Sequence, residues 1–252
     1  FAATQGLLMR LKQLVFVVAA CLWMISGPAY AQVVFNDDST VISLNGKMQF
    51  IADDSNSFAL KDAIAAERAG QMKSLSGRLS RGYVRSSSWL RVVVNNDGAT
   101  LVTPSLIMEP PFLDEVDVYV RAGADLGQPE DYQRFSVGDH TPVAELPLPT
   151  ALMTVPLSIA QGASLNIFIH VYSFSTHTLD TRLVSPSELM AKTSWHQSWQ
   201  SAYIGIAIAL ALINFLFALR LRDRVYLMYG LYLLSIGCAT IGLEGLTRML
   251  LP

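Results

Sequence analysis

Few residues of this chain have the types and spacing that catalysis requires. Its four histidines are widely separated: His140, His170, His177 and His196. The sequence contains no H-E-x-x-H, G-x-S-x-G or C-x-x-C motif. Glycosidases use two carboxylates, for which Asp114, Asp117 and Asp180 could be considered. Because Asp114 and Asp117 flank the start of an expected strand, we interpret them as solvated turn acids and expect no enzyme activity, metal or cofactor.

Binding chemistry fits the residue types better. Sugar sites in β-sandwiches combine an aromatic ring, which stacks on the apolar face of a pyranose, with polar groups for its hydroxyls. Five residues on expected strands supply these types: Trp89, Arg91, Tyr119, His170 and Tyr172. In the alternative interpretation Trp89 belongs to the core, and Arg91 and His170 face solvent. We take the five as candidates for a small-ligand site.

Short strands must position these residues. Alternation of apolar and polar residues predicts strands at Trp89–Asn95, Val116–Arg121, Gln133–Val137, Ala151–Leu157, Ser164–Val171 and Asp180–Val184. An Asp-Gly pair in Asn95–Gly98 predicts a hairpin turn to a further strand at Thr100–Met108, where Pro104 indicates an edge or a bulge. Strands at this spacing, without helices between them, predict an antiparallel sandwich.

The segment before residue 89 carries weaker signals. Asp37–Ser39 and Asp53–Ser57 are polar turns, and Ser74–Ser88 has the Ser, Gly and Arg content of a loop. Ala59–Met72 is rich in residues that favour helices, so we expect one short helix there.

Two long apolar segments follow the sandwich. Ala202–Leu221 carries one charge, Arg220 near its end, and Val225–Leu243 carries none. Roughly 20 mainly apolar residues cross a bilayer as a helix. The alternative is two buried core helices of a soluble protein. The whole chain has only 15% charged residues and a mean hydropathy of +0.37, so we predict a transmembrane hairpin. We expect the amide of Asn214 in the first segment to hydrogen-bond to another helix.

The turn of this hairpin predicts its orientation. Arg220, Arg222 and Arg224 crowd the turn, and positive residues stay on the cytoplasmic side of a membrane. Trp195 and Trp199 precede the first segment, where indole rings favour the lipid headgroups. We therefore expect residues 32–200 to lie outside the cytoplasmic membrane.

The N-terminus has the pattern of an export signal. A basic region at Met9–Lys12, an apolar run at Leu14–Ile25 and an A-x-A site at Ala29–Ala31 predict cleavage after residue 31. Two alternatives stay open, a lipoprotein box ending at Cys21 and an uncleaved anchor. The other cysteine is Cys238 in the second apolar segment, so no disulfide is expected in the exported domain.

A helix start is predicted where the sandwich meets the membrane segment. Ser185-Pro186-Ser187-Glu188 has the pattern of a capping box with proline at the first helical position. Because nothing in Leu189–Ser201 requires a break, this helix is expected to continue into the first apolar segment. A flexible linker is the alternative.

Several motifs together point to a family. Those of the membrane region are Tyr203-x-Gly205, Asn214, Leu221-Arg222-Asp223-Arg224-x-Tyr226-Leu227-x-Tyr229, Leu243–Leu246 and Leu251-Pro252. They resemble the opening of the membrane region in bacterial seven-transmembrane receptors with diverse intracellular signalling modules. Trp89–Arg91, Leu113–Tyr119 and Leu165–Ser173 are similar to the second type of extracellular domain in that family, although members often have arginine where this chain has His170.

The resemblance implies an all-β jelly-roll-like antiparallel sandwich followed by a transmembrane α-helical hairpin. The expected domains are a leader and signal peptide at 1–31, a periplasmic sensor at 32–185, and a juxtamembrane helix with the first two of seven transmembrane helices at 186–252. The protein would be a multi-pass receptor of the bacterial inner membrane with a carbohydrate-like ligand. Its output module, such as a diguanylate cyclase or histidine kinase, would lie beyond residue 252.

The expected partners follow from this interpretation. They are a small ligand, the lipid bilayer and, as an open alternative, a second copy of the chain. A net charge of −2 gives no reason to expect nucleic acid. Two other functions compete with signalling. One is a non-signalling binding or structural module at the membrane. The other is a transporter component, but the interiors of the apolar segments lack the ionisable residues that transport usually requires.

Overall fold

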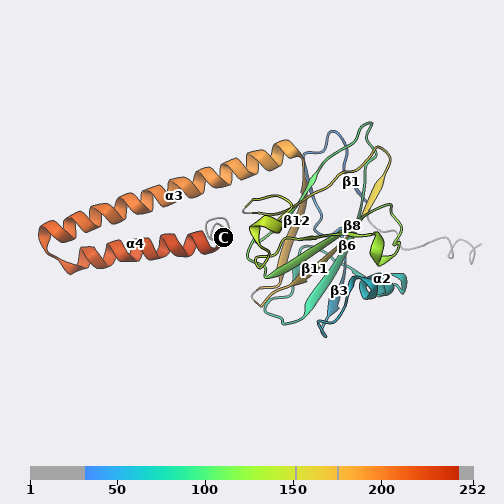
Figure 1. Cartoon of the computed structure of the whole chain (residues 1–252), viewed down its shortest axis with the longest axis horizontal. Coiled ribbons are helices and arrows are strands. Elements are labelled where there is room, and N and C mark those ends of the chain that lie inside the picture. Colours follow the sequence, from blue (N-terminus) through green and yellow to red (C-terminus); the bar gives the residue numbers. More distant parts are fainter. Residues whose placement is uncertain (1–31, 151, 175, 244–252) are drawn as a thin grey trace, which may run out of the picture. The chain divides into compact units, whose positions relative to one another are not determined.

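The computed structural model describes residues 32–150, 152–174 and 176–243. The expected signal peptide, Cys21 and the motifs after residue 243 lie outside these residues. The described chain forms two β-sheets, a short helix α2 and two long helices, α3 and α4 (Figure 1).

The larger sheet has the strand order β4–β3–β6–β11–β8–β9, and β1 pairs in parallel with the end of β6. Its strands are β1 (Val33–Val34), β3 (Gln49–Asp53), β4 (Lys73–Ser74), β6 (Ser87–Asn95), β8 (Glu115–Ala122), β9 (Gln133–Ser136) and β11 (Ser164–Tyr172). All its other pairings are antiparallel.

The smaller sheet has the order β10–β7–β12–β2, and β5 also pairs with β12. Its strands are β2 (Val41–Ser43), β5 (Leu79–Ser80), β7 (Ser105–Glu109), β10 (Met153–Pro156) and β12 (Thr178–Val184). From β6 to β8, and again from β9 to β12, successive strands alternate between the sheets, as in a jelly roll. The predicted antiparallel sandwich is confirmed.

Strand periodicity divides the side chains between the two faces of each sheet. The main core contains Leu90 and Val92 of β6 and Ile167 and Ile169 of β11, all at most 3% exposed. Successive strand residues point to opposite faces. The odd-numbered residues of β6 and the even-numbered residues of β11 therefore lie on the outer face of the larger sheet.

Helix α2 (Leu60–Arg68) covers part of that outer face (Figure 1). Its residues Leu60, Ala63 and Ile64 pack with Trp89 and Phe168 in a second apolar cluster. Two short 3-10 helices, η1 (Pro129–Asp131) and η2 (Val143–Glu145), lie in later connections. The predicted helix at Ala59–Met72 is confirmed, with shorter bounds.

Helix α3 (Pro186–Leu221) confirms the helix predicted to begin at Pro186. The Ser185 hydroxyl caps it by accepting a hydrogen bond from the Glu188 N–H. The helix continues without a break for 36 residues. Among the described residues, it is the one helix whose length and hydropathy suit a membrane span.

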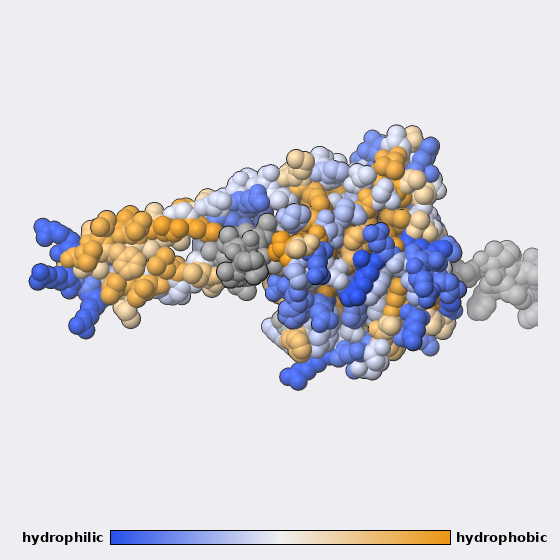
Figure 2. Space-filling model, viewed as in Figure 1, coloured by the Kyte–Doolittle hydropathy of each residue, from blue (hydrophilic) through white to orange (hydrophobic). Residues whose placement is uncertain are grey.

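Helix α4 (Arg224–Leu243) returns alongside α3 (Figure 1). Between them Arg222 has a positive φ of 52°, and the Asp223 carboxylate accepts a hydrogen bond from the Val225 N–H. The helices approach closely at Ala211 and Gly230, where an added Cβ on the glycine would lie 3.4 Å from the Ala211 carbonyl oxygen. In Figure 2 the hairpin is largely apolar and its turn is hydrophilic.

Within the part of the chain that the structure describes, Asn214 makes no bond to another helix, in contrast to the prediction. Its side-chain amide donates to the Leu210 carbonyl oxygen at 2.8 Å, four residues earlier in the same helix. The amide nitrogen thus bonds inside α3, because a carbonyl one turn back is within its reach.

The predicted hairpin between β6 and β7 is wrong, because these strands belong to different sheets. The Asn96 side chain donates to the carbonyl oxygens of Thr100, Ile159 and Ala160, and so holds the chain where it crosses the sandwich. Because the chain crosses from one sheet to the other, the apolar residues of β6 and β7 face the same core from opposite sides.

The segment before residue 89 is also more ordered than predicted. Strand β3, which was not predicted, pairs with β6 from Gln49 to Asp53, where the second expected polar turn begins. The Asp53 carboxylate accepts hydrogen bonds from the Phe58 N–H and the Ser87 hydroxyl. Burial alone would raise the pKa of Asp53, but hydrogen bonds from Ser55, Phe58 and Ser87 together lower it.

Candidate functional site

The five residues selected from the sequence share the outer face of the larger sheet. Strand pairing places His170 of β11 between Trp89 of β6 and Asp117 of β8, in one row across three strands. The next row places Tyr119 beside Phe168, which pairs with Arg91. Tyr172 lies on the same face, two residues beyond His170.

Trp89 is covered in this arrangement. Its side chain is 1% exposed under α2, and its ring centroid lies 5.7 Å from that of Tyr119 and 4.8 Å from that of His170. The structure thus favours the core interpretation of Trp89 over an exposed sugar platform. Its indole N–H has no hydrogen-bond partner among the described residues.

Arg91 is buried in an ion pair. Its Nη1 lies 2.7 Å from Glu67 Oε1 of α2, and the two side chains are 6% and 3% exposed. The guanidinium also donates to the side chains of Gln49 on β3 and Asn166 on β11. These contacts tie α2 to three adjacent strands, so Arg91 faces protein and not the solvent expected in the alternative interpretation.

His170, Tyr119 and Tyr172 remain half-buried at the uncovered part of the same face. Burial lowers the pKa of His170, although the carboxylates of Asp117 and Glu115 oppose this effect. The imidazole is therefore neutral near pH 7, with one nitrogen that donates and one that accepts hydrogen bonds. Such a group suits a hydroxyl-bearing ligand.

A pocket of about 210 Å³ opens beside this row, at the start of β8. Its polar lining residues are Asp114, Glu115, Asp117, Arg134, Ser136, His140, Thr141 and Glu145. This volume is below the roughly 300–1,000 Å³ usual for drug-sized ligands, so the pocket suits a smaller one.

Hydrogen bonds organise the floor of this pocket. The Asp117 carboxylate accepts from Arg134 Nη2 at 2.9 Å and from the Ser136 hydroxyl at 2.6 Å. Gly138 permits the close approach of its segment to β8, because an added Cβ would lie 2.5 Å from the Asp114 carbonyl oxygen. The interpretation of Asp117 as a solvated turn acid is wrong, since it lies on β8 and is 9% exposed.

An exposed and a half-buried aromatic side chain lie beside the pocket residue Asp114. The Asp114 carboxylate accepts hydrogen bonds from the Ser173 hydroxyl and the Phe174 N–H, each at 2.7 Å. Phe174 is 68% exposed, and its ring lies 5.1 Å from that of Tyr172. Tyr172 in turn pairs with Glu115 across the strands. Aromatic and polar groups therefore meet at one end of β8 and β11.

Most of the pocket residues were missed from the sequence, because they come from separate segments. Arg134 and Ser136 were inside a predicted strand, and only the pairing of β9 with β8 brings them to Asp117. The alternation around Asp117 was a usable signal, since it places this acid on the same face as Tyr119. Among the described residues, no group of three acidic, histidine or cysteine side chains could hold a metal ion.

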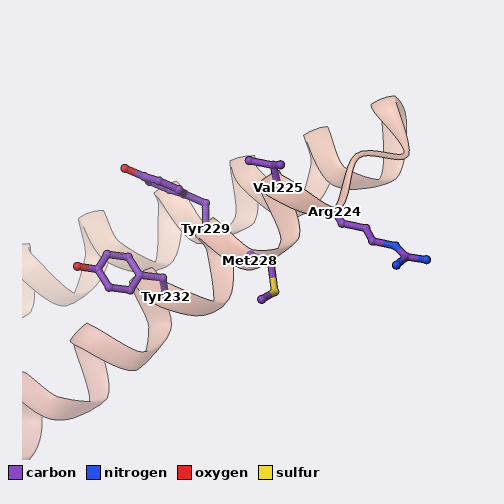
Figure 3. A pocket seen from close by; sticks show the side chains of 5 residues that line it. All are labelled: Arg224, Val225, Met228, Tyr229 and Tyr232. Atoms are coloured by element: carbon purple, nitrogen blue, oxygen red, sulfur yellow. The ribbon is translucent and has the colours of Figure 1, made fainter.

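A second pocket, of about 380 Å³, lies on α4. Arg224, Val225, Met228, Tyr229 and Tyr232 line it, and Figure 3 shows the two tyrosines extending away from Arg224. In a bilayer such a surface packs against lipid or another helix, so we assign it no ligand.

Comparison with known families agrees with this arrangement. Residues 45–185 match the family model described as 7TMR-DISM extracellular 2, and residues 196–252 match that of 7TM diverse intracellular signalling. The chain belongs to the 7TMR-DISM family. It is thus part of a membrane signalling receptor with an outward-facing sensor domain, and the resemblance noted from the sequence is confirmed.

Other comparisons add little about the ligand of this receptor. No match was found among curated proteins. A solved family 6 carbohydrate-binding module is 14% identical with a TM-score of 0.24, and the match covers 41% of this chain and 71% of the module. A likeness this slight carries no argument about what the receptor binds.

His177 is a buried histidine outside the pocket. Its side chain is 0% exposed, and neither ring nitrogen has a hydrogen-bond partner among the described residues. Its backbone is held by bonds to Arg81 and Gly82. Burial, with smaller contributions from the charges of Arg81 and His170, lowers the pKa of His177 to about 4.

We predict that Arg91→Met destabilises the sandwich by about 3–5 kcal/mol, because it leaves the Glu67 carboxylate buried without its partner. The double variant Arg91→Met/Glu67→Met should recover most of this loss. Urea unfolding of the whole chain in detergent measures both. The control is Arg121→Met, whose partners Asp125 and Asp131 are 72% and 49% exposed, with an expected loss of about 0–1 kcal/mol. A double variant no more stable than Arg91→Met would contradict the prediction.

We predict that His177 makes stability fall in acid. In the unfolded chain the pKa of this histidine is about 6.5, so below that pH the unfolded state binds more protons than the folded state. The unfolding free energy then falls by up to about 1.4 kcal/mol per pH unit until the folded pKa is reached. The unfolding free energy should therefore drop between about pH 6.5 and 4. His177→Leu should flatten this part of the curve, whereas His140→Leu, at an exposed position, should not. Parallel curves for all three proteins would exclude the effect.

Proposed function

We propose that this chain is the sensor and first membrane part of a multi-pass receptor in the bacterial inner membrane. Its sandwich lies in the periplasm and binds a small carbohydrate-like ligand. The observation that carries the proposal is the continuity of α3, which begins directly after β12 and runs as one helix into the apolar segment.

The charge distribution supports this orientation. Arg220, Arg222 and Arg224 are exposed and gather at the turn between α3 and α4, where the positive-inside rule assigns the cytoplasm. Trp195 and Trp199 are exposed as well, with ring centroids 5.7 Å apart. Both precede the apolar segment, at the level expected for the outer headgroups.

The pocket at β8 supports a small polyhydroxylated ligand. The pocket carboxylates accept hydrogen bonds from hydroxyls, and Arg134 donates to ring or hydroxyl oxygens. Neutral His170 beside the pocket can donate or accept a hydrogen bond. Phe174 and Tyr172 offer rings on which a sugar face stacks. The acids serve binding and not catalysis in this proposal, because Asp114 and Asp117 are engaged by Ser173, Phe174, Arg134 and Ser136.

Topology is tested with alkaline phosphatase, which is active only outside the cytoplasm. A fusion after Met190 should be active and a fusion after Arg224 inactive. Changing the three turn arginines to asparagine should weaken the preference for this orientation. In the reverse orientation the arginines would have to cross the bilayer, and on insertion scales an arginine at mid-bilayer is unfavourable by about 2.5–3.5 kcal/mol. The reverse activity pattern would overturn the proposed topology.

Ligand binding is tested with the whole chain in nanodiscs and a panel of neutral mono- and disaccharides. At least one sugar should raise the unfolding temperature, since a ligand of the native state stabilises it. Phe174→Ser should weaken its binding by roughly tenfold, or about 1.4 kcal/mol. Tyr83→Ser is the control, because Tyr83 is 87% exposed elsewhere. No response to any sugar, or equal affinity of both variants, would count against the assigned ligand and site.

A further inference from the structure

The first turns of α3 lie against the outer face of the smaller sheet. Leu189 packs on Ile107, Leu152 and Val184 in an apolar cluster separate from the main core. One turn further, Lys192 Nζ lies 2.9 Å from Glu109 Oε1. Residues three apart share one face of a helix, so the apolar and the ionic contact act on the same side of α3.

The backbone fixes where this helix begins. The Ser185 N–H donates to the Thr40 carbonyl oxygen, and the Leu189 N–H donates to the Ser185 carbonyl oxygen, at 2.8 and 2.9 Å. Together with the Ser185 cap on Glu188, these bonds set the first turn of α3 relative to β12. A helix start held by the backbone alone can still swing, and the two side-chain contacts oppose this motion.

The charges around Lys192 favour Glu109 as its partner. Asp180 lies opposite Glu109 across β12 and β7. Both oxygens of Asp180 accept hydrogen bonds from Arg182, at 3.1 and 3.0 Å, which leaves Glu109 for the ammonium group. The Lys192 and Glu109 side chains are only 28% and 30% exposed. Such a pair is less screened by water than an ion pair at the open surface.

We propose that Leu189 and Lys192 form a latch that makes α3 a rigid extension of the smaller sheet, so that the sandwich sets the rotation of the first membrane span. The role in signalling rests on the proposed receptor function, whereas the contact itself does not.

The pocket is linked to this latch by short stretches of chain. Glu109 ends β7, and Asp114 of the pocket follows after four residues. Asp114 also holds Ser173 and Phe174, which precede β12 and hence α3. A ligand that engages Asp114 competes with these bonds. It therefore acts on β7 and β12, the two strands that carry the latch. Through this contact the ligand can bind the latched and unlatched states with different affinity, which is what shifts their populations.

The latch is tested by spin-label distances in the whole chain in nanodiscs. Nitroxides on Thr103→Cys and Gln197→Cys, both exposed positions, report the sandwich and α3 in a Cys21→Ser/Cys238→Ser background that removes both native cysteines. The wild-type latch should give one narrow distance distribution. Leu189→Ser should broaden it, whereas Met190→Ser, at a neighbour that is 72% exposed, should not.

Single-alanine insertions provide a second, matched pair. An alanine after Met190 turns Lys192 by about 100° away from Glu109 and should broaden the distribution. An alanine after Lys192 rotates the later part of α3 equally but keeps the latch, so the distance should shift and stay narrow. Equal distributions for the paired variants, or a broad one for the unaltered chain, would overturn the latch. Because no ligand is used, this result is independent of the sugar and topology tests.

Discussion

The buried ion pair between Arg91 and Glu67 determines how the larger sheet presents its outer face. A guanidinium at the centre of β6 can be buried only if its charge is paired and its N–H groups are bonded. Glu67 supplies the charge, and Gln49 and Asn166 supply further acceptors from the strands on either side. Helix α2 is thereby fixed over Trp89. The uncovered part of the face, from Tyr119 to Tyr172, is what remains for a ligand.

A helix thus covers part of the outer face of each sheet, with different consequences. On the larger sheet, α2 covers one region and leaves the pocket at the start of β8 open. On the smaller sheet, the start of α3 packs through Leu189 and Lys192 on β7 and β12. Because β7 leads to β8 and β12 leads to α3, short stretches of chain join the pocket to the two strands on which α3 packs. In the proposed mechanism, the sandwich therefore connects the pocket to the membrane helix.

Some predictions failed because local patterns cannot show which sheet a strand joins. The Asp-Gly turn after β6 has the chemistry of a hairpin, but the chain crosses to the other sheet there, held by the bonds of Asn96. Strand β3 lacks alternation and owes its place to pairing with β6. Asp117 has the local sequence of a turn acid, but the pairing of β9 with β8 brings Arg134 and Ser136 beside it.

Features that depend on neighbouring residues along the chain are predictable from the amino-acid sequence alone. These are the apolar segments with their basic turn, the helix start at Ser185–Glu188 and most strands of the sandwich. The face shared by the five candidate residues depends on the register of β6, β8 and β11. The accessibility of each candidate also depends on contacts between distant segments. Burial of Trp89 and Arg91 depends on Glu67, more than 20 residues away, and the pocket combines β8, β9 and η2. Contacts between distant segments leave no periodic signal, because each partner satisfies a charge or a hydrogen bond that the chain alone leaves open.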